Sequence, residues 1–433
     1  MPDDVVITGM GVVSPIGVGE SEFWDALYGG KSGAAPINCL DTADLPRKVG
    51  CQVKEHRDLE FEARSPTGGA QRRIGRAARL AIAAARQAIH SSNLTADGIE
   101  SLGPRRISII VGTTMGETEF IENRLAVDPK DWLSHEHVGE ILSGHPGSIA
   151  EHVADCVAGG CASEFSRQSP NHPIAESRNG WRNDVASTLD LYGACAAGNM
   201  AIAAARTHLL DGRCDVALAG GADGFSRLAF IGFMRLRVMA AEVCRPFDVE
   251  RDGLFVGEGA AIFVLERESS ARARGAPIRA RIVGTGNASE NYHPTRPHPD
   301  GDGLSRAVGT ALHDAALSPT EIDYVCAHGT GTPQNDAIEV NVMNRLFAAG
   351  TPFSSIKALT GHTMGAAAAI EAAACVLMLE KQTLIPTWNL ANVLQPCALE
   401  AVAGAPRSAR LRCAINNSAG FGGYNSSIIL AGA

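Results

Sequence analysis

Length, composition and charge describe an ordinary globular protein. The chain has 433 residues, 45% hydrophobic and 20% charged, which allows a large core and one or two domains. A formal net charge of -9 and a 5% share of aromatic residues argue against nucleic-acid binding. The start of the chain lacks a positively charged leader, no apolar run reaches about 18 residues, and the eleven cysteines have no paired or metal-ligand spacing. We therefore expect a cytoplasmic protein with reduced thiols, no metal and no membrane partner.

Strands and helices alternate along the first half of the chain. Strand patterns cover residues 5–8, 107–111, 186–191, 216–219 and 260–266, and helical patterns cover 22–28, 76–90 and 196–210. This alternation predicts an α/β fold with mostly parallel sheets covered by helices. Residues 155–184 are rich in Cys, Gly, Ser, Asn and Pro, which is typical of a loop or an insertion. Residues 267–276 form a charged connection to the second half.

The order of landmarks repeats after residue 276. A strand at 278–286, a helix at 306–316 and a strand at 323–327 follow the order of the first half. The helix after His362 corresponds to the helix after Cys195, and residues 422–430 correspond to 257–265. Three landmarks that recur in one order favour a duplication over chance similarity. We therefore predict two similar αβ halves, residues 1–266 and 277–433, with the functional site between them.

Cys195 lies where a strand pattern runs into an alanine-rich helix. Backbone N–H groups and the helix dipole at such a turn favour a thiolate, and the small residues around it leave room for a substrate. A buried, inert thiol is the commonest role of an unpaired cysteine. Two histidine motifs further along the chain favour a nucleophile instead.

The two histidines follow in glycine-rich motifs. His328 ends the strand at 323–327, where ligands bind in open α/β sheets, and the hydroxyls of Thr330 and Thr332 can contact a polar ligand. His362 opens an apolar helix, whose N-terminus disfavours the imidazolium and so favours a neutral hydrogen-bond donor. Glu371, inside the same helix, needs a partner, and Lys357 is the candidate.

A fourth motif, residues 417–425, contains three glycines that free backbone N–H groups to bind an oxyanion. With all four motifs in this order, the chain resembles the β-ketoacyl-acyl carrier protein synthases of the elongating, Cys-His-His type. The likeness runs from Val5-Val-Ile-Thr-Gly through residues 246–259 to the last glycine motif. The resemblance implies a thiolase-like fold, in which the duplicated αβ halves form an αβαβα layered sandwich.

The resemblance also implies a role for each motif residue. Cys195 matches the nucleophile that becomes acylated, and His328 and His362 match the pair that promotes decarboxylation. Lys357 matches the lysine that orders the site. Phe421 matches the gating residue, and its backbone N–H forms the oxyanion hole with that of Cys195. Thr330 and Thr332 match the residues that hold the phosphopantetheine arm. Glu371 and Asp336 match residues that give structural support.

The activity that the resemblance implies is a decarboxylative Claisen condensation, catalysed by an enzyme of the acyltransferase class. An acyl group on Cys195 reacts with malonyl-acyl carrier protein to give a β-ketoacyl-acyl carrier protein, with no metal or redox cofactor. An acidic carrier protein needs a basic docking patch, which the resemblance implies at Arg72, Arg73 and Arg237, although solvated surface charge is an equally good explanation of any one arginine. The resemblance further implies a dimer, with itself or with a chain-length-factor-like paralogue.

The chain departs from the family around the nucleophile. Gly and Ala flank Cys195 where Ser or Thr is common, and Ala419 stands where a Phe is usual. These departures favour a specialised polyketide, polyene or modified fatty acid pathway over bulk fatty acid synthesis. A non-catalytic partner subunit would lose the nucleophile, and a thiolase would need a second cysteine inside the C-terminal glycine motif, which Cys413 precedes. The alternative that stays open is an acyltransferase that moves the acyl group to an alcohol or amine without condensation.

Overall fold

The computed structural model describes residues 3–59, 74–94, 106–118, 122, 149–158 and 185–433. Most of the predicted insertion at 155–184 therefore lies outside the described residues, as do Arg72 and Arg73. Only its first four residues are described, and they belong to a helix.

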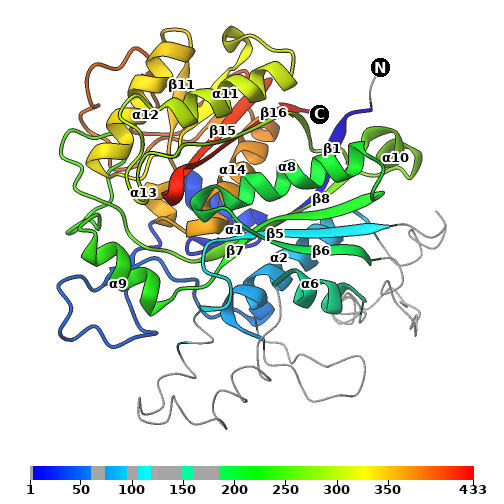
Figure 1. Ribbon diagram of the computed structural model, residues 1–433, viewed down its shortest axis with the longest axis horizontal. Coiled ribbons are helices and arrows are strands. Elements are labelled where there is room, and N and C mark those ends of the chain that lie inside the picture. The colour runs from blue at the N-terminus through cyan, green and yellow to red at the C-terminus, as the bar shows by residue number, and fades with distance from the viewer. Residues whose placement is uncertain (1–2, 60–73, 95–105, 119–121, 123–148, 159–184) are drawn as a thin grey trace.

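The first half has the predicted alternation of elements (Figure 1). Its elements are β1 (Val5–Ser14), β2 (Gly17–Val18), α1 (Glu20–Gly29), β3 (Ala35–Pro36), β4 (Val49–Gly50), η1 (Arg57–Leu59), α2 (Arg76–Ser91), β5 (Ile107–Thr113), α6 (Ile149–Ala158), β6 (Val185–Tyr192), η4 (Ala194–Ala196), α8 (Ala197–Leu210), β7 (Val216–Asp223), α9 (Arg227–Arg235) and β8 (Gly259–Arg267). The predicted charged connection contains a short helix, α10 (Glu268–Ala273).

The second half repeats this succession. Its elements are β9 (Ala280–Ser289), α11 (Asp302–Asp314), η5 (Pro319–Glu321), β10 (Tyr324–Cys326), α12 (Pro333–Leu346), β11 (Pro352–Ser354), α13 (Lys357–Thr360), η6 (Met364–Ala366), α14 (Ala367–Lys381), β12 (Thr383–Leu384), β13 (Glu400–Ala401), β14 (Arg407–Ser408), β15 (Cys413–Gly420), η7 (Phe421–Gly423) and β16 (Tyr424–Gly432). Among the helices of the described ranges, none is long and apolar enough to cross a bilayer.

The strand order shows the duplication directly. The main sheet has the order β13-β11-β10-β15-β16-β9-β1-β8-β7-β5-β6. Read outward from the junction of β9 and β1, the order β1-β8-β7-β5-β6 of the first half matches β9-β16-β15-β10-β11 of the second. The predicted duplicated halves are thus present in the fold, while the exact boundaries at 266 and 277 stay a prediction.

The prediction of mostly parallel sheets was wrong, because the sheet is mixed. Strand β5 runs parallel to β6 and β7, and β10 runs parallel to β11 and β15. The pairs β1–β8, β7–β8, β1–β9, β9–β16 and β15–β16 are antiparallel. The three-residue turn η7 joins β15 to β16, and so short a connection cannot make the crossover that parallel strands need.

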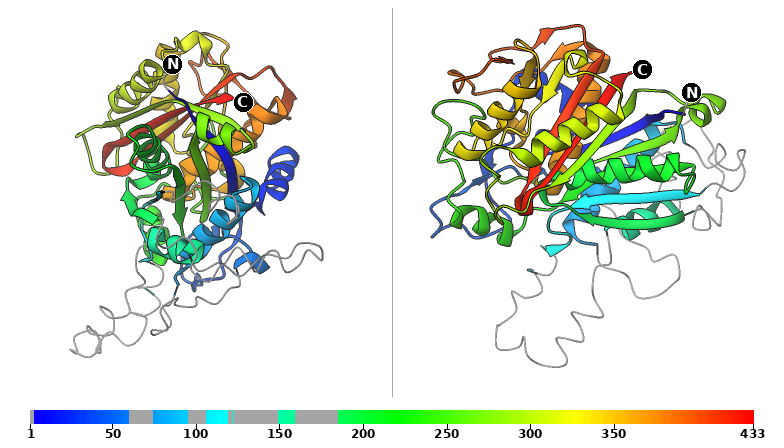
Figure 2. Two further views of the ribbon diagram at one scale, coloured as in Figure 1. Left: turned by 90° about the vertical axis from the view of Figure 1, so that its right-hand side faces the viewer. Right: turned by 45° about the horizontal axis from the view of Figure 1, so that its top comes forward.

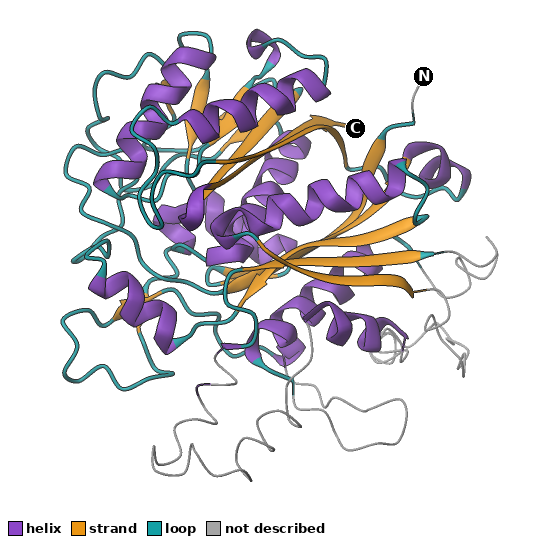
Figure 3. Ribbon diagram, viewed as in Figure 1, coloured by secondary structure: helices purple, strands orange, loops and turns teal. Residues whose placement is uncertain are grey.

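Helices cover the sheet in layers (Figures 1 and 2). Helices α2 and α6 lie against the outer face of the first half, and α11 lies against the outer face of the second. The alanine-rich α8 and α14 pack against each other between the two halves, as the helices at the centre of Figure 3 show. The result is the predicted αβαβα sandwich, with the residues of α14 from Ala367 to Leu379 all buried.

Pairs of glycines let the outer helices approach the central strands. The prediction ended the first strand at Gly9, but β1 continues to Ser14. A Cβ atom at Gly9 or Gly11 would lie 2.0 Å from the carbonyl oxygens of α2, and one at Gly284 or Gly286 would lie within 2.3 Å of those of α11. The glycines therefore mark close helix packing at equivalent places in both halves, not strand ends.

Candidate active site

The candidate nucleophile lies at the predicted junction of a strand and a helix. Cys195 is the middle residue of η4, between β6 and α8, and is only 5% exposed. Ala194 before it has a φ of 48°, a conformation that residues other than glycine rarely adopt. The hydroxyl of Ser418 on β15 donates a hydrogen bond to the carbonyl oxygen of Cys195 at 2.9 Å. This bond fixes the nucleophile turn to the strand that leads to the glycine motif.

The resting Cys195 is a thiol, contrary to the expected thiolate. Burial raises the pKa of Cys195 to about 12 and outweighs the lowering by the Lys357 ammonium. Asp223 raises this pKa further, whereas the backbone N–H groups of Phe421 and of Cys195 itself lower it through hydrogen bonds to the sulfur. The two donors that the oxyanion hole requires therefore both face the Cys195 side chain.

Phe421 opens the turn η7 and contacts a second aromatic residue. Its ring stacks on Phe233 with a centroid distance of 5.6 Å, and the Phe233 ring lies 6.1 Å from that of His362. Phe233 belongs to α9, and the sequence offered no signal for it, because it is one apolar residue among several. It links the predicted gate to one of the two histidines.

His328 lies two residues after β10, at the carboxyl end of that strand as predicted. Its backbone N–H and that of Gly329 both donate to the carboxylate of Glu339, at 2.6 and 2.8 Å. Burial raises the pKa of Glu339 to about 7. Glu339 on α12 thus fixes the backbone of the histidine loop, and it was missed in the sequence although it follows the histidine motif by three residues.

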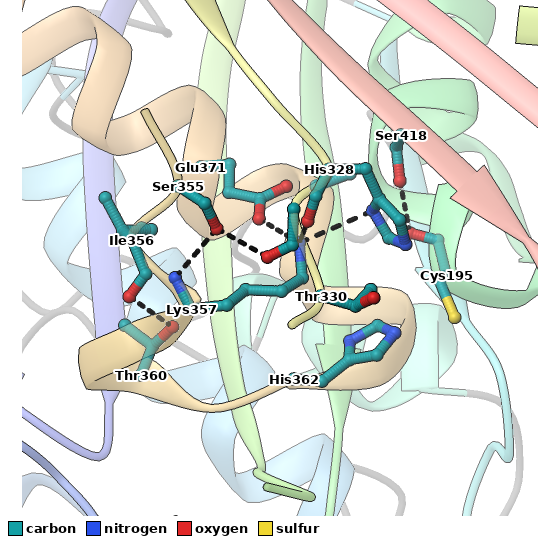
Figure 4. Close-up of polar contacts among 12 residues, drawn as sticks. Cys195, His328, Thr330, Ser355, Ile356, Lys357, Thr360, His362, Glu371 and Ser418 are labelled. Atoms are coloured by element: carbon teal, nitrogen blue, oxygen red, sulfur yellow. Dashed lines mark hydrogen bonds and ion pairs between the residues drawn. The ribbon is translucent and has the colours of Figure 1, made fainter. Parts of the chain in front are cut away.

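Lys357 and Glu371 form the predicted ion pair (Figure 4). Both side chains are 1% exposed, and burial raises the pKa of Glu371 to about 7. The Lys357 ammonium also donates to the carbonyl oxygen of His328 at 2.6 Å and lies 3.4 Å from Nδ1 of its ring. Lys357 therefore orients both the backbone and the imidazole of His328.

The rings of His328 and His362 lie side by side, with centroids 5.4 Å apart and an interplanar angle of 82°. Figure 4 shows both rings and the Cys195 sulfur on the same side of the Lys357 ammonium. Burial, followed by the charge of Lys357, holds the pKa of each histidine well below its usual value. The expected neutral state of His362 thus has burial as its main cause, since α14 begins only at Ala367.

The hydrogen bonds of the two rings define their tautomers. The backbone N–H of Met364 donates to Nδ1 of His362 at 3.3 Å, and the Lys357 ammonium faces Nδ1 of His328. Because Nδ1 accepts in both rings, the single proton of each neutral imidazole resides on Nε2. The site therefore offers two Nε2–H donors next to a buried thiol.

Thr330, Thr332 and Asp336 form one polar loop beside His328. The hydroxyls of Thr330 and Thr332 are 2.9 Å apart. The carboxylate of Asp336 accepts hydrogen bonds from the backbone N–H groups of Thr330, Gly331 and Phe247. Asp336 thus holds the backbone of this loop, and its supporting role in catalysis stays a prediction.

Asp223, at the end of β7, is a further residue that the sequence did not reveal. Its buried carboxylate accepts from the Thr113 hydroxyl at 2.6 Å and from the backbone N–H groups of Thr114, Met115 and Gly365. Burial raises the pKa of Asp223 to about 6. The carboxylate ties the loop after β5 to η6 and so lies beneath the His362 segment.

The arginines proposed for docking have different surroundings. Arg237 is exposed, as are Leu236 before it and Arg235, the last residue of α9. Arg76, which neighbours Arg72 and Arg73 in the sequence, pairs with the buried Glu258 at 2.8 Å and has a structural role. Of the predicted docking residues, only Arg237 can be placed on the described surface.

Comparisons with known proteins identify the family of this chain. The family model "Beta-ketoacyl synthase, N-terminal domain" matches residues 2–176 and 182–271, and "Beta-ketoacyl synthase, C-terminal domain" matches residues 279–391. A 3-oxoacyl-[acyl-carrier-protein] synthase 2 of Synechocystis is 32% identical over 97% of this chain and 96% of its own. A putative polyketide β-ketoacyl synthase 1 of Streptomyces halstedii is 32% identical over 99% of this chain and 98% of its own.

Solved structures of ketosynthases are also similar to this chain. The ishigamide ketosynthase/chain length factor has a TM-score of 0.81 and 34% identity, with complete coverage of both chains. A type II polyketide synthase acyl-carrier protein in complex with its ketosynthase has a TM-score of 0.79 and 27% identity, again with complete coverage. The chain belongs to the β-ketoacyl synthase family and has the predicted thiolase-like fold. None of these relatives supports the alternative of an acyltransferase without condensation.

Proposed function

We propose that Cys195, His328 and His362 carry out the decarboxylative Claisen condensation of this β-ketoacyl-acyl carrier protein synthase. The observation that carries the proposal is the convergence of a buried thiol, two Nε2–H donors and two backbone N–H donors in one site. Cys195 is the nucleophile, the histidines stabilise the enolate, and Lys357 orients His328.

In the first step, the sulfur of Cys195 attacks the carbonyl carbon of an acyl thioester. The backbone N–H groups of Cys195 and Phe421 bind the oxyanion of the tetrahedral intermediate. When this intermediate collapses, the bond to the carrier thiol breaks, and the proton of Cys195 leaves with that thiol. The acyl group is then held on Cys195 in a site that excludes water.

In the second step, malonyl thioester enters and loses carbon dioxide. The electron pair of the broken carbon–carbon bond moves toward the thioester oxygen, where the Nε2–H groups of His328 and His362 stabilise the enolate. Two neutral imidazoles can donate these hydrogen bonds without protonating the carbanion. The enolate carbon then attacks the acyl group, the thiolate of Cys195 leaves, and it takes up a proton from solvent after the product has left the site.

Each step balances with hydrogen bonds and proton transfers alone, and we therefore propose that the reaction uses no metal or redox cofactor. The substrates arrive on the phosphopantetheine arm of an acyl carrier protein. The paired hydroxyls of Thr330 and Thr332, beside His328, are suited to hold the amide groups of that arm. Phe421 is the gate, because its ring stacks on Phe233 next to His362.

The carrier protein docks near the end of α9 in this proposal. Phe233 on this helix contacts the site, and the exposed Arg235 and Arg237 lie two and four residues after Phe233 in the sequence. Basic side chains there attract the acidic surface of a carrier protein. The Arg72 and Arg73 part of the docking patch lies outside the described residues and stays a prediction.

A dimer is the second assembly that we propose. Among the strands of the described residues, β6 ends the sheet order, and Leu189 and Tyr192 on it are 43% and 60% exposed. An exposed, apolar edge strand is suited to pair with another chain. The partner is a second copy or a chain-length-factor-like paralogue. We further propose that the enzyme is cytoplasmic and belongs to a specialised pathway, in keeping with its polyketide relatives.

Intact mass spectrometry tests the proposed function. The protein is incubated with a panel of acyl-carrier thioesters, beside Cys195→Ala, and is then chased with malonyl-carrier protein. We expect acylation that Cys195→Ala abolishes and a malonyl-dependent β-ketoacyl product. Acylation without that product would instead support transfer without condensation, and acylation that persists in Cys195→Ala would overturn the nucleophile assignment.

A further inference from the structure

Two buried asparagines lie in the alanine-rich layer between the halves. Asn199 on α8 and Asn416 on β15 are both completely buried. Many of their neighbours on α8 and α14 are alanines, which belong to the apolar core. The reaction steps proposed above use neither asparagine.

The two side chains connect three elements. The Nδ2 group of Asn416 donates to Oδ1 of Asn199 at 3.0 Å and to the carbonyl oxygen of Ala368 on α14 at 2.8 Å. The Nδ2 group of Asn199 returns a hydrogen bond to the backbone carbonyl of Asn416 at 3.1 Å. Asn416 is thus the point where α8, α14 and β15 meet.

Each of these three elements carries one part of the site. Helix α8 follows Cys195, and α14 follows His362 and contains Glu371. Strand β15 leads into Phe421, whose backbone N–H is the second oxyanion donor. A shift of one element against another would change the distance between the two oxyanion donors or between the nucleophile and the histidines.

Stability does not explain the pair. Asparagine favours a helix interior less than alanine does, and burying amides is costly unless all their hydrogen bonds are made. Oδ1 of Asn416 has no hydrogen-bond partner among the described residues. Two apolar side chains of similar shape would make this core at least as stable. Directional hydrogen bonds, however, fix both distance and orientation, which apolar contacts between alanines do not.

We propose that Asn199 and Asn416 are positioning residues that set the register of α8, α14 and β15 and thereby hold the two oxyanion donors at their working separation. This inference rests on the proposed function, because it requires Cys195 to be the acylated nucleophile. The Ser418 bond to the Cys195 carbonyl oxygen fixes the turn itself, whereas the asparagines fix the helix behind it.

Two variants, Asn199→Ala and Asn416→Leu, remove different hydrogen bonds of the pair. Asn199→Ala removes the contact between α8 and β15 but leaves Asn416 bonded to Ala368. We expect it to slow acyl transfer to Cys195 about tenfold, because displaced oxyanion donors stabilise the intermediate less well. Malonyl decarboxylation, which depends on the histidines, should stay within about twofold. Asn416→Leu removes the side-chain hydrogen bonds to Asn199 and to the Ala368 carbonyl oxygen and leaves only the bond from Asn199 to the backbone carbonyl of residue 416. It should slow both half-reactions at least tenfold.

The experiment measures the two half-reactions separately in the purified protein. Acyl transfer is followed by intact mass of Cys195 in a single turnover, and decarboxylation by formation of acetyl-carrier protein. The control is Thr8→Val, which removes a buried hydrogen bond from Thr8 to Glu266 at 2.7 Å on the central strands β1 and β8. It should lower the unfolding temperature while leaving both half-reactions within about twofold of wild type.

The outcomes separate the inference from the proposed function. If Asn199→Ala transfers the acyl group at the wild-type rate, or if it changes only the unfolding temperature as Thr8→Val does, the positioning role is overturned. If wild-type protein is not acylated at all, the proposed function fails and the inference fails with it. If Asn416→Leu does not fold, Asn199→Ala alone decides, because alanine is a favoured residue inside α8.

Discussion

Replacing Lys357 by methionine tests the part of the site on which most other contacts depend. The side chain of Lys357 is 1% exposed and contacts Glu371, the carbonyl oxygen of His328 and the His328 ring. Methionine has a similar length but cannot donate hydrogen bonds. The variant therefore leaves Glu371 without its cation and His328 without its anchor.

The size of the stability loss depends on the protonation of Glu371. Removing one member of a buried ion pair costs about 3–5 kcal/mol. Because the pKa of Glu371 is raised to about 7, this carboxyl can take up a proton near neutral pH, and we expect a loss of about 3 kcal/mol at pH 7. The charge of Lys357 lowers the pKa of Glu371, so the pKa in the folded variant lies higher still.

The sign of the pH dependence follows from this shift. A carboxyl whose pKa is higher in the folded than in the unfolded state loses stability as pH rises between the two values. In the wild type this loss ends at about pH 7, the folded-state pKa of Glu371. In Lys357→Met it continues, so the gap in unfolding free energy widens by about 1.4 kcal/mol per pH unit above 7.

Chemical denaturation at several pH values and steady-state kinetics measure the two effects. We expect kcat of Lys357→Met to fall about 100-fold, because a misplaced imidazole loses most of its contribution. The control Lys357→Met with Glu371→Leu should recover much of the stability but none of the activity, since it removes the buried carboxylate and not the defect at His328. A Lys357→Met enzyme with kcat within about threefold of wild type would refute the reasoning.

Four further predictions concern other contacts. Glu339→Gln should lower kcat about tenfold with the KM for malonyl-carrier protein unchanged, because an amide cannot accept both N–H groups of the histidine loop as a carboxylate does; an unchanged kcat would contradict this. Arg237→Glu should raise the KM for the carrier about tenfold at low salt and much less at high salt, without changing kcat; a salt-independent KM would argue against docking there. The imidazole NMR signals of His328 and His362 should not titrate between about pH 6 and 8, because both rings stay neutral there, and a midpoint near 6.5 for either ring would contradict the lowered pKa values. Alkylation of Cys195 by iodoacetamide should rise about tenfold per pH unit up to about pH 10, since burial raises the pKa of this thiol to about 12; a plateau below pH 8 would mean that the backbone donors outweigh burial.

Much of this molecule could be predicted from local pattern. Buried strands such as β5 and β7 and the alanine-rich α2, α8 and α14 have strong periodicity, so their presence and order were confirmed. The ion pair of Lys357 with Glu371 was also predictable, because a carboxylate in so apolar a helix requires a cation. The order of the motifs was enough to bring Cys195, His328 and His362 into one site.

The features of the site that could not be predicted depend on contacts between segments that are distant in the sequence. Asp223 lies at the end of an ordinary strand, and only the fold brings it to Thr113 and Gly365. Phe233 is one of several apolar residues on α9, and nothing local separates it from core. The pKa of Cys195 was misjudged for the same reason: the helix N-terminus is visible in the sequence, but the burial that outweighs it is not.

The duplication also explains why the two halves contribute different chemistry to one site. Strands β6 and β11 occupy equivalent places, and each leads to a turn with a residue of positive φ, Ala194 at 48° and Met364 at 54°. The turn of the first half presents Cys195. At the equivalent position of the second half stands Gly365, where a Cβ would lie 2.7 Å from the Asp223 carboxylate and 2.6 Å from the backbone nitrogen of Thr114. No thiol can fit there, and the backbone N–H of Met364 instead holds the His362 ring. The same turn, present in both halves, thus supplies the nucleophile from one half and an oriented imidazole from the other. The packing around Asp223 excludes a side chain at Gly365 and so determines that the thiol comes from the first half.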